Sequence, residues 1–360
     1  MTYGHKSQHS AADNGANSST PTPVVKYGAH GGRVLEKPLP PIADQGSFFA
    51  GGRTVTDKNG ATTRADHLYA QYQKPINPRR YPLVLWHGGG ETAKTWESTP
   101  DGREGYNTIF LRQEFSVYLV DQPGVGRGGK PAEDVTCPVI YSDPYIWELF
   151  RWGQWSPPAN PTPTYYPDIQ VSQGTQDADQ YLKQRMLNLT LLWGPIIYEA
   201  GVTLFEAIGP AVLINHSAGG GNGWGIALLT DKVMGIVAYE PVNFVFVEGE
   251  VPPNLGRFDA MVVSAAEFKK PTRLPIQIVY GDNLDMPGTD PKRKQWWNEV
   301  HYGAEQFVAA VNRHGGDAQL LLLRDTGLPG HTHFPFSDYG NDKVADLLSQ
   351  FLKEKGLDQY

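Results

Sequence analysis

The chain has 360 residues, of which 40% are hydrophobic and 19% charged, so it can bury a sizeable core and is not a disordered protein. Its net charge of −7 argues against a nucleic-acid partner or a polybasic membrane surface. A single cysteine excludes an intramolecular disulfide and cysteine-rich zinc frameworks. The sequence contains no run of 18 apolar residues, so it predicts no membrane-spanning helix.

The first 25 residues are polar and rich in Gly, Ser and Asn, which predicts a mobile tail ahead of a single domain over residues 26–360. The tail lacks the apolar core of a signal peptide. We therefore expect a soluble protein, and the sequence leaves open whether it is cytoplasmic or exported after processing.

Strand-like and helix-like segments alternate along the rest of the chain. Residues 67–73 alternate with period 2, which predicts an edge strand. Continuous apolar runs, typical of strands buried on both faces, follow at 82–86, 115–120, 211–215, 233–239, 275–280 and 319–323. Helical patterns cover 179–200 (broken near Gly194-Pro195), 221–230, 292–313 and 342–355. This alternation predicts an α/β fold with a mostly parallel central sheet and helices on both faces.

One segment, at about 131–180, breaks this alternation. Residues 131–178 hold eight prolines and a cluster of eight aromatic residues without periodicity. Such an insertion is typical of a cap or lid over a binding site, and we expect Trp152 and Trp155 to line the substrate site. The alternative is an irregular excursion whose aromatic side chains simply pack on the body of the domain.

The sequence Asn215-His216-Ser217-Ala218-Gly219 stands where a buried strand meets a glycine-rich helix start. A tight strand-to-helix turn of this kind exposes a nucleophilic serine above the sheet, and small residues must flank it. Asn215 replaces the first glycine of the usual pattern, so the match is degenerate. The alternative is that Ser217 is an ordinary helix N-cap.

A second motif, His87-Gly88-Gly89-Gly90, follows the first strongly buried strand. Glycines at this point allow backbone N–H groups to point into an open site, as an oxyanion hole requires. We expect His87 to support the loop by hydrogen bonding. The alternative is a plain glycine turn.

A serine nucleophile needs a histidine base, and in this order of elements the base follows the last strand. His331 and His333 stand there, and their spacing does not separate them. His301 and His314 belong to an amphipathic helical pattern and are expected to be solvated.

The histidine in turn needs a carboxylate. Glu240 and Asp282 each end a predicted strand, and both stay open as the acid. Turn chemistry is the alternative role for Asp282, and helix or loop capping is the alternative for Glu240.

Further residues carry a resemblance to a known family. The run TWESTPDGR at 95–103 is the most specific, and 110–112, 120–127 and 330–333 add to it. Over residues 45–340 the chain resembles the bacterial esterase 713 group of α/β-hydrolases. The resemblance implies an α/β-hydrolase fold and members that can be exported and dimeric, so that a homodimer is one expectation.

The resemblance also implies site residues. It favours a triad of Ser217, His333 and Glu240, with oxyanion donors at the backbone of Gly89 and Ala218. Gly88 and His216, beside these groups, are expected to contact substrate. The family has two adjacent cysteines where this chain has Gly89-Gly90, and a glutamine in place of Ala218. These departures predict a different pocket shape and substrate preference.

The expected function is hydrolysis of a small-molecule carboxylic ester or lactone through an acyl-enzyme, without metal or organic cofactor. Two other functions stay open: a lyase or isomerase that uses the Ser/His pair without an acyl intermediate, and a binding protein with a relict triad. The aromatic insertion suggests a medium-sized apolar or aromatic substrate group, but the sequence does not separate esters from lactones or amides.

Overall fold

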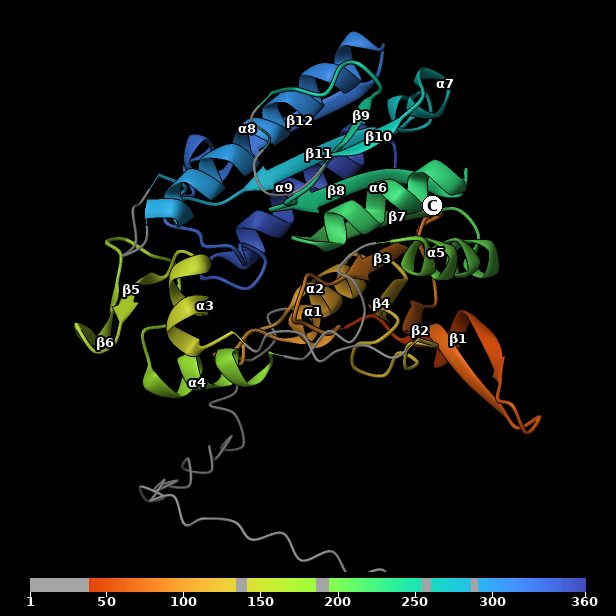
Figure 1. Cartoon of the computed structure of the whole chain (residues 1–360), viewed down its shortest axis with the longest axis horizontal. Helices are drawn as coiled ribbons and strands as arrows, with labels where there is room; N and C mark the ends of the chain where they lie inside the picture. Colours follow the sequence, from red (N-terminus) through yellow and green to blue (C-terminus); the bar gives the residue numbers. More distant parts are fainter. Residues whose placement is uncertain (1–38, 134–140, 186–193, 254, 256–259, 286–290) are drawn as a thin grey trace, which may run out of the picture. The chain divides into compact units, whose positions relative to one another are not determined.

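An eight-stranded sheet forms the centre of the computed structural model, which describes residues 39–133, 141–185, 194–253, 255, 260–285 and 291–360. Its order is β1-β2-β4-β3-β7-β8-β11-β12 (Figure 1). β1 and β2 are antiparallel to each other, β2 is antiparallel to β4, and the remaining neighbours are parallel. The strands are β1 Ile42–Thr56, β2 Thr62–Pro75, β3 Leu83–Trp86, β4 Val117–Asp121, β7 Ala211–His216, β8 Val233–Tyr239, β11 Pro275–Tyr280 and β12 Asp317–Leu322.

The six continuous apolar runs all form strands, and those of β8 and β11 have the predicted bounds. The prediction of an edge strand at 67–73 is wrong. That segment lies within β2, which pairs with β1 on one side and β4 on the other. The edge is β1, whose sequence IADQGSFFAGGRTVT is too rich in glycine and polar residues to give an apolar signal.

Two hydrophobic clusters lie on opposite faces of the sheet, because successive strand side chains point to opposite sides. Val84 and Leu213 pack in the cluster that contains residues of α5, α6 and α8, whereas Leu85 and Val212 pack in the one that contains residues of α2 and α9. These helices are α2 Tyr106–Arg112, α5 Pro195–Ile208, α6 Gly219–Leu229, α8 Pro291–Arg313 and α9 Asn341–Glu354. The predicted α/β fold, with a mostly parallel central sheet and helices on both faces, is confirmed.

The aromatic insertion has more regular structure than its sequence suggests. It contains α3 Asp143–Leu149, β5 Gly153–Ser156, β6 Asn160–Tyr165 and α4 Thr175–Lys183. Figure 1 shows these elements grouped beyond the carboxyl ends of the parallel strands. Ligands of open α/β sheets bind at that edge, so the insertion lies on the side where the Ser217 turn is expected.

The remaining elements are short connections and lateral additions. They are α1 Lys94–Glu97, β9 Val245–Val247, β10 Met261–Val263, α7 Ala265–Phe268 and two 3-10 turns, Pro271–Arg273 and Leu323–Thr326. The described residues all belong to one compact unit. The predicted tail, residues 1–25, lies outside the described residues. Within the described part of the chain, no helix is long and apolar enough to cross a membrane.

Candidate active site

Ser217 occupies the turn between β7 and α6, as the motif predicts. Its φ is +51°, a left-handed conformation that a non-glycine residue rarely adopts, and the side chain is half-buried. Its backbone N–H donates to the Tyr239 carbonyl oxygen at 2.9 Å, which ties the turn to the neighbouring strand. A Cβ atom at Gly88 would lie 2.9 Å from Ser217 Cβ, so only glycine lets the second motif approach this turn. This is the strained turn that a nucleophile needs.

Glu240 and His333 meet beside this turn. Glu240 follows β8 directly, again with a positive φ of +53°. His333 Nδ1 donates to Glu240 Oε2 at 3.1 Å, and both side chains are almost fully buried. The ring of His333 lies 4.6 Å, centroid to centroid, from the ring of His216, the residue before Ser217. The structure therefore places the histidine and acid that the family resemblance favours against His216, the residue before the predicted nucleophile.

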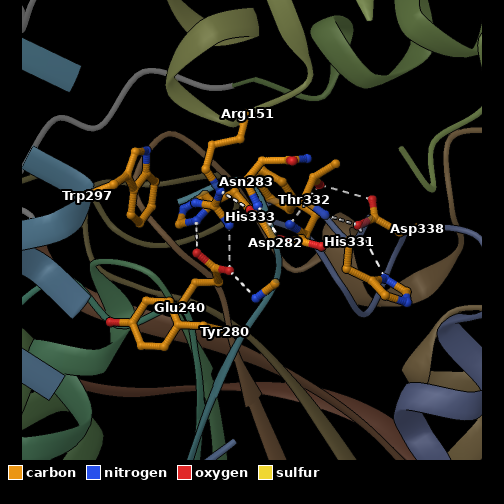
Figure 2. Close-up of polar contacts among 12 residues, drawn as sticks. Arg151, Glu240, Tyr280, Asp282, Asn283, Trp297, His331, Thr332, His333 and Asp338 are labelled. Carbon is orange, nitrogen blue, oxygen red and sulfur yellow. Dashed lines mark hydrogen bonds and ion pairs between the residues drawn. The ribbon is translucent and has the colours of Figure 1, made fainter. Parts of the chain in front are cut away.

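The alternative histidine has another partner. His331 Nδ1 faces Asp338 Oδ2 at 3.5 Å, and Figure 2 shows the rings of His331 and His333 directed to opposite sides of their loop. This geometry associates His333, and not His331, with Glu240.

The alternative acid serves the loop itself. The Gly330 N–H donates to Asp282 Oδ2 at 3.1 Å, and the Asp282 N–H donates to the His331 carbonyl oxygen at 2.6 Å. The Asp282 carboxylate also pairs with Arg324. Asp282 thus braces the segment that carries both histidines, and this bracing goes beyond the turn chemistry expected from its sequence.

Two histidines of the α8 region lie elsewhere. His314 follows the helix and pairs with Glu250 on the surface at 3.0 Å. His301 is half-buried, with its ring 5.6 Å from that of Tyr280. The expectation that His301 is solvated is wrong, because its face of α8 packs on β11.

The charges around Glu240 and His333 shift their pKa values. Burial alone raises the pKa of Glu240, but the Arg151 guanidinium and the His333 hydrogen bond outweigh it and hold the pKa at about 2. Burial, together with nearby His216, lowers the pKa of His333 to about 3 against the opposing effect of Glu240. At neutral pH the carboxylate is ionised and the imidazole is neutral, as a general base requires.

The His87-Gly88-Gly89-Gly90 loop has a defined hydrogen-bond pattern. The Gln122 N–H donates to His87 Nε2 at 3.3 Å, so this nitrogen carries no proton, and Nδ1 donates to the Gly88 carbonyl oxygen at 2.7 Å. In a trans peptide, the Gly88 C=O and the Gly89 N–H point in opposite directions. His87 therefore fixes the direction of the Gly89 N–H, as its expected supporting role implies.

Ala218 stands at the N-cap of α6 and is buried. The first backbone N–H groups of a helix have no intrahelical acceptor and are available to an anionic oxygen. The expected second oxyanion donor is thus at a helix start. The α6 residue Gly219 lies against the other motif, because a Cβ atom there would be 2.5 Å from the His87 carbonyl oxygen.

A second glutamate–histidine pair adjoins the first. His216 Nδ1 lies 3.2 Å from Glu91 Oε2, and His216 Nε2 donates to the His333 carbonyl oxygen at 2.8 Å. Arg185 pairs with Glu91 at 2.9 Å and donates to the Gly89 carbonyl oxygen at 3.0 Å. Burial raises the pKa of Glu91, but the charges of His216 and Arg185 hold it at about 2. Both ring nitrogens of His216 therefore face acceptor oxygens.

Sequence reasoning missed three charged residues of this site: Glu91, Arg151 and Arg185. Two of them carried a usable signal. Glu91 directly follows the glycine motif, and Arg151 stands between Phe150 and Trp152 in the aromatic insertion. A charge within an aromatic run needs a buried counter-charge. The sequence does not reveal which carboxylate provides it.

The two tryptophans expected at the substrate site have different surroundings. Trp152 is buried and, together with Tyr181 and Phe334, lines a hollow next to the histidine loop. Trp155 packs on Trp147 at 5.7 Å and donates to the Pro161 carbonyl oxygen. A role for either residue in substrate binding stays a prediction. Within the described ranges, no group of three or more His, Cys, Asp or Glu side chains could hold a metal ion.

Comparisons with known proteins show similarity to ester hydrolases. The chain is 26% identical to a novel bacterial esterase of solved structure, with a TM-score of 0.71 over 89% of this chain and 98% of that chain. It is 23% identical over 325 residues to "Probable secreted lipase phiG" of Fungal sp. (strain ATCC 74256), covering 80% of this chain and 86% of the relative. Naproxen esterase (carboxylesterase NP) from Bacillus subtilis is 12% identical over 87% of this chain and 93% of that chain, with a TM-score of 0.43. No family model matches the chain. The predicted resemblance to a bacterial esterase group is confirmed.

Proposed function

We propose that this chain, a carboxylic ester hydrolase with the α/β-hydrolase fold, uses Ser217 as nucleophile, His333 as general base and Glu240 as the acid of the triad. The observation that carries the proposal is the 3.1 Å hydrogen bond between the buried His333 and Glu240 side chains. It lies beside a serine held at a φ of +51° in a strand-to-helix turn. Nucleophile, base and orienting carboxylate are the three groups that acyl transfer requires.

In this mechanism Ser217 Oγ attacks the ester carbonyl carbon while His333 Nε2 takes the hydroxyl proton. The N–H groups of Gly89 and Ala218 stabilise the oxyanion that forms. His333 then protonates the leaving alcohol, which departs and leaves an acyl-serine. Water, deprotonated by His333, attacks the acyl group and releases the acid. Glu240 keeps the proton of the neutral imidazole on Nδ1 and stabilises the imidazolium.

The substrate we propose is a small-molecule ester or lactone with a medium-sized apolar or aromatic group. Support comes from the aromatic insertion, which approaches the base: the Phe150 ring stacks on the His333 ring at 4.9 Å with 11° between the planes. Aromatic surfaces favour apolar and aromatic groups over charged ones.

A serine-directed fluorophosphonate probe and a panel of aryl esters, lactones, amides and carbamates test the proposal. The probe should modify Ser217 of the wild-type protein, and Ser217→Ala should lose labelling and on the order of 10⁶-fold in kcat, as in other triad hydrolases. Ser264→Ala is the matched control, since Ser264 is the N-cap of α7 and should leave both readouts unchanged.

Three outcomes would contradict the proposal. Retention of more than a few per cent of activity by Ser217→Ala would exclude this nucleophile. Turnover without labelling would indicate a lyase or isomerase that forms no acyl-enzyme. Absence of both labelling and turnover across the panel would indicate a binding protein.

A further inference from the structure

Arg151 comes from the insertion but reaches the acid of the triad. Its Nη2 donates to Glu240 Oε1 at 2.6 Å and its Nε donates to the Asp282 carbonyl oxygen at 2.8 Å. Its guanidinium carbon lies 4.2 Å from the centre of the Trp297 ring, and only 2% of the side chain is exposed. Figure 2 shows Arg151 entering from the side of the site opposite Glu240, with Trp297 next to it. The side chain is therefore held on three sides.

The two oxygens of the Glu240 carboxylate have different hydrogen-bond partners. Oε1 accepts from the Gly281 N–H at 2.5 Å and from Arg151, while Oε2 faces His333 Nδ1. The side chain is 0% exposed, so no water shell fixes its orientation. The two bonds to Oε1 determine the rotation of the carboxylate and hence the direction of Oε2. A bond from a planar guanidinium is stronger and more directional than one from a neutral donor.

The segment that carries Arg151 is itself attached to the histidine. The His333 N–H donates to the Phe150 carbonyl oxygen at 3.3 Å, and the Phe150 ring stacks on the imidazole. The Trp297 indole N–H donates to the Leu149 carbonyl oxygen at 2.9 Å, which holds the end of α3 against α8. Arg151 has a φ of +65°, a strained conformation that these contacts maintain. Three consecutive insertion residues thus contact the groups around His333.

We propose that Arg151 is a positioning residue of the reaction: it aims the Glu240 carboxylate at His333 and offsets its charge, so that docking of the insertion completes the catalytic apparatus. The proposal rests on the Ser–His–Glu function proposed above. It extends that function by assigning to a residue of the insertion the task of orienting the Glu240 carboxylate. A residue that acts only on stability would leave the ionisation of His333 unchanged.

The charged groups around His333 predict how its ionisation depends on Arg151. Glu240 raises the pKa of His333, whereas burial, His216 and Arg151 lower it. On the side of the Ser217 turn, the charged groups are Glu91 and Arg185, which pair with each other next to His216. Trp297 and Phe150 add no charge. Removing the positive charge of Arg151 leaves Glu240 uncompensated, so the pKa of His333 rises.

The pH dependence of kcat/KM tests this. The Arg151→Met side chain has a similar length but no charge and no hydrogen-bond donors. In this variant the acid limb of the profile, where kcat/KM falls because His333 becomes protonated, should move to higher pH by about one pH unit or more. kcat at the pH optimum should fall at least about tenfold, with KM nearly unchanged. Arg151→Lys keeps the charge and should leave the acid limb in place while still losing kcat. Arg324→Met is the matched control. Arg324 also binds Asp282, through the side-chain carboxylate, but it does not contact Glu240, so its loss should not shift the acid limb of the profile.

The double variant Glu240→Gln/Arg151→Met separates this proposal from the triad. If Arg151 acts through Glu240, adding Arg151→Met to Glu240→Gln should cost less than twofold further in kcat. An unmoved acid limb in Arg151→Met, or an equal further loss in the Glu240→Gln background, would refute the positioning role. Should Arg151→Met not fold, wild-type kcat in Arg151→Lys would refute it. A fully active Glu240→Gln would refute the triad instead.

Discussion

Two sets of the same three residue types lie next to each other in this site: Arg151, Glu240 and His333 in one, and Arg185, Glu91 and His216 in the other. We refer to them as the Glu240 set and the Glu91 set. Among the described residues, the hydrogen bonds of the His333 ring involve Nδ1 alone, whereas both nitrogens of His216 are engaged. A base needs one nitrogen for the nucleophile. In the proposed mechanism, similar composition therefore gives proton transfer in one set and bracing in the other.

The largest effect should separate the two histidines. His333→Gln removes the proposed base and should lower kcat by about 10⁴-fold or more. His216→Gln keeps one donor for the His333 carbonyl oxygen and should lose on the order of 10²-fold or less, through displacement of the loop. Steady-state kinetics on an aryl ester measures both. Equal losses of kcat in the two variants would contradict the assignment of His333 as the base and His216 as a bracing residue.

The two carboxylates should differ less in stability than in activity. Glu240→Gln leaves the buried Arg151 without its counter-charge, which costs about 3–5 kcal/mol of unfolding free energy, and Glu91→Gln should cost somewhat less because its partner Arg185 is 18% exposed. Per folded molecule, however, Glu240→Gln should lose about 10⁴-fold in kcat, as for other triad acids. Glu91→Gln should lose about 10²-fold or less. Denaturant unfolding and active-site titration give the two numbers, and the reverse ranking would transfer the role of acid to Glu91.

A pH series should reveal the lowered pKa of the His333 ring in the stability of the protein. The pKa of His333 is lowered to about 3, while that of an unfolded histidine is about 6.5. Below pH 6.5 the unfolded chain therefore binds a proton that folded His333 does not, and stability falls as the pH decreases, by up to about 1.4 kcal/mol per pH unit. His333→Gln should show a shallower fall between pH 6.5 and 4.5 in urea unfolding. Parallel curves for the two proteins would contradict the shift.

Nitrogen-15 spectra of the histidine rings test the ionisation of His333 directly. At pH 7, His333 should give the two distinct shifts of a neutral imidazole, because its pKa is lowered to about 3. His333→Gln assigns the signals. The two similar shifts of an imidazolium at this position would contradict the lowered pKa.

The smallest effect concerns the insertion. Trp152 lines the hollow with Phe334, whereas Trp155 packs within the insertion on Trp147. Trp152→Ala should change the ranking of esters by acyl or alcohol bulk, by a factor of about ten between the ends of the series. Trp155→Ala should change the ranking less than twofold. A uniform loss for all substrates in Trp152→Ala would mean that this residue supports the fold and does not select the substrate.

Several parts of the site were predictable because their signals are local. The apolar runs that form β3, β7, β8 and β11 and the glycines around Ser217 and His87 are visible in short windows of sequence. Spacing alone left Glu240 against Asp282 and His333 against His331 open, and the family resemblance favoured the two that meet in the structure. The edge strand β1 was missed because its glycine and polar residues hide the alternation.

The sequence by itself determined the order of buried strands, the position of the strained serine and the presence of a glycine loop that can carry oxyanion donors. Each of these depends on residues close together in the chain. Only the tertiary structure decided that Arg151 pairs with Glu240, 89 positions away, and that Arg185 pairs with Glu91, 94 positions away. Local patterns define periodicity and turns, but the partner of a buried charge is set by which elements the sheet order places together. The different roles that we propose for the Glu240 set and the Glu91 set depend on that placement, because residue type alone is the same in both.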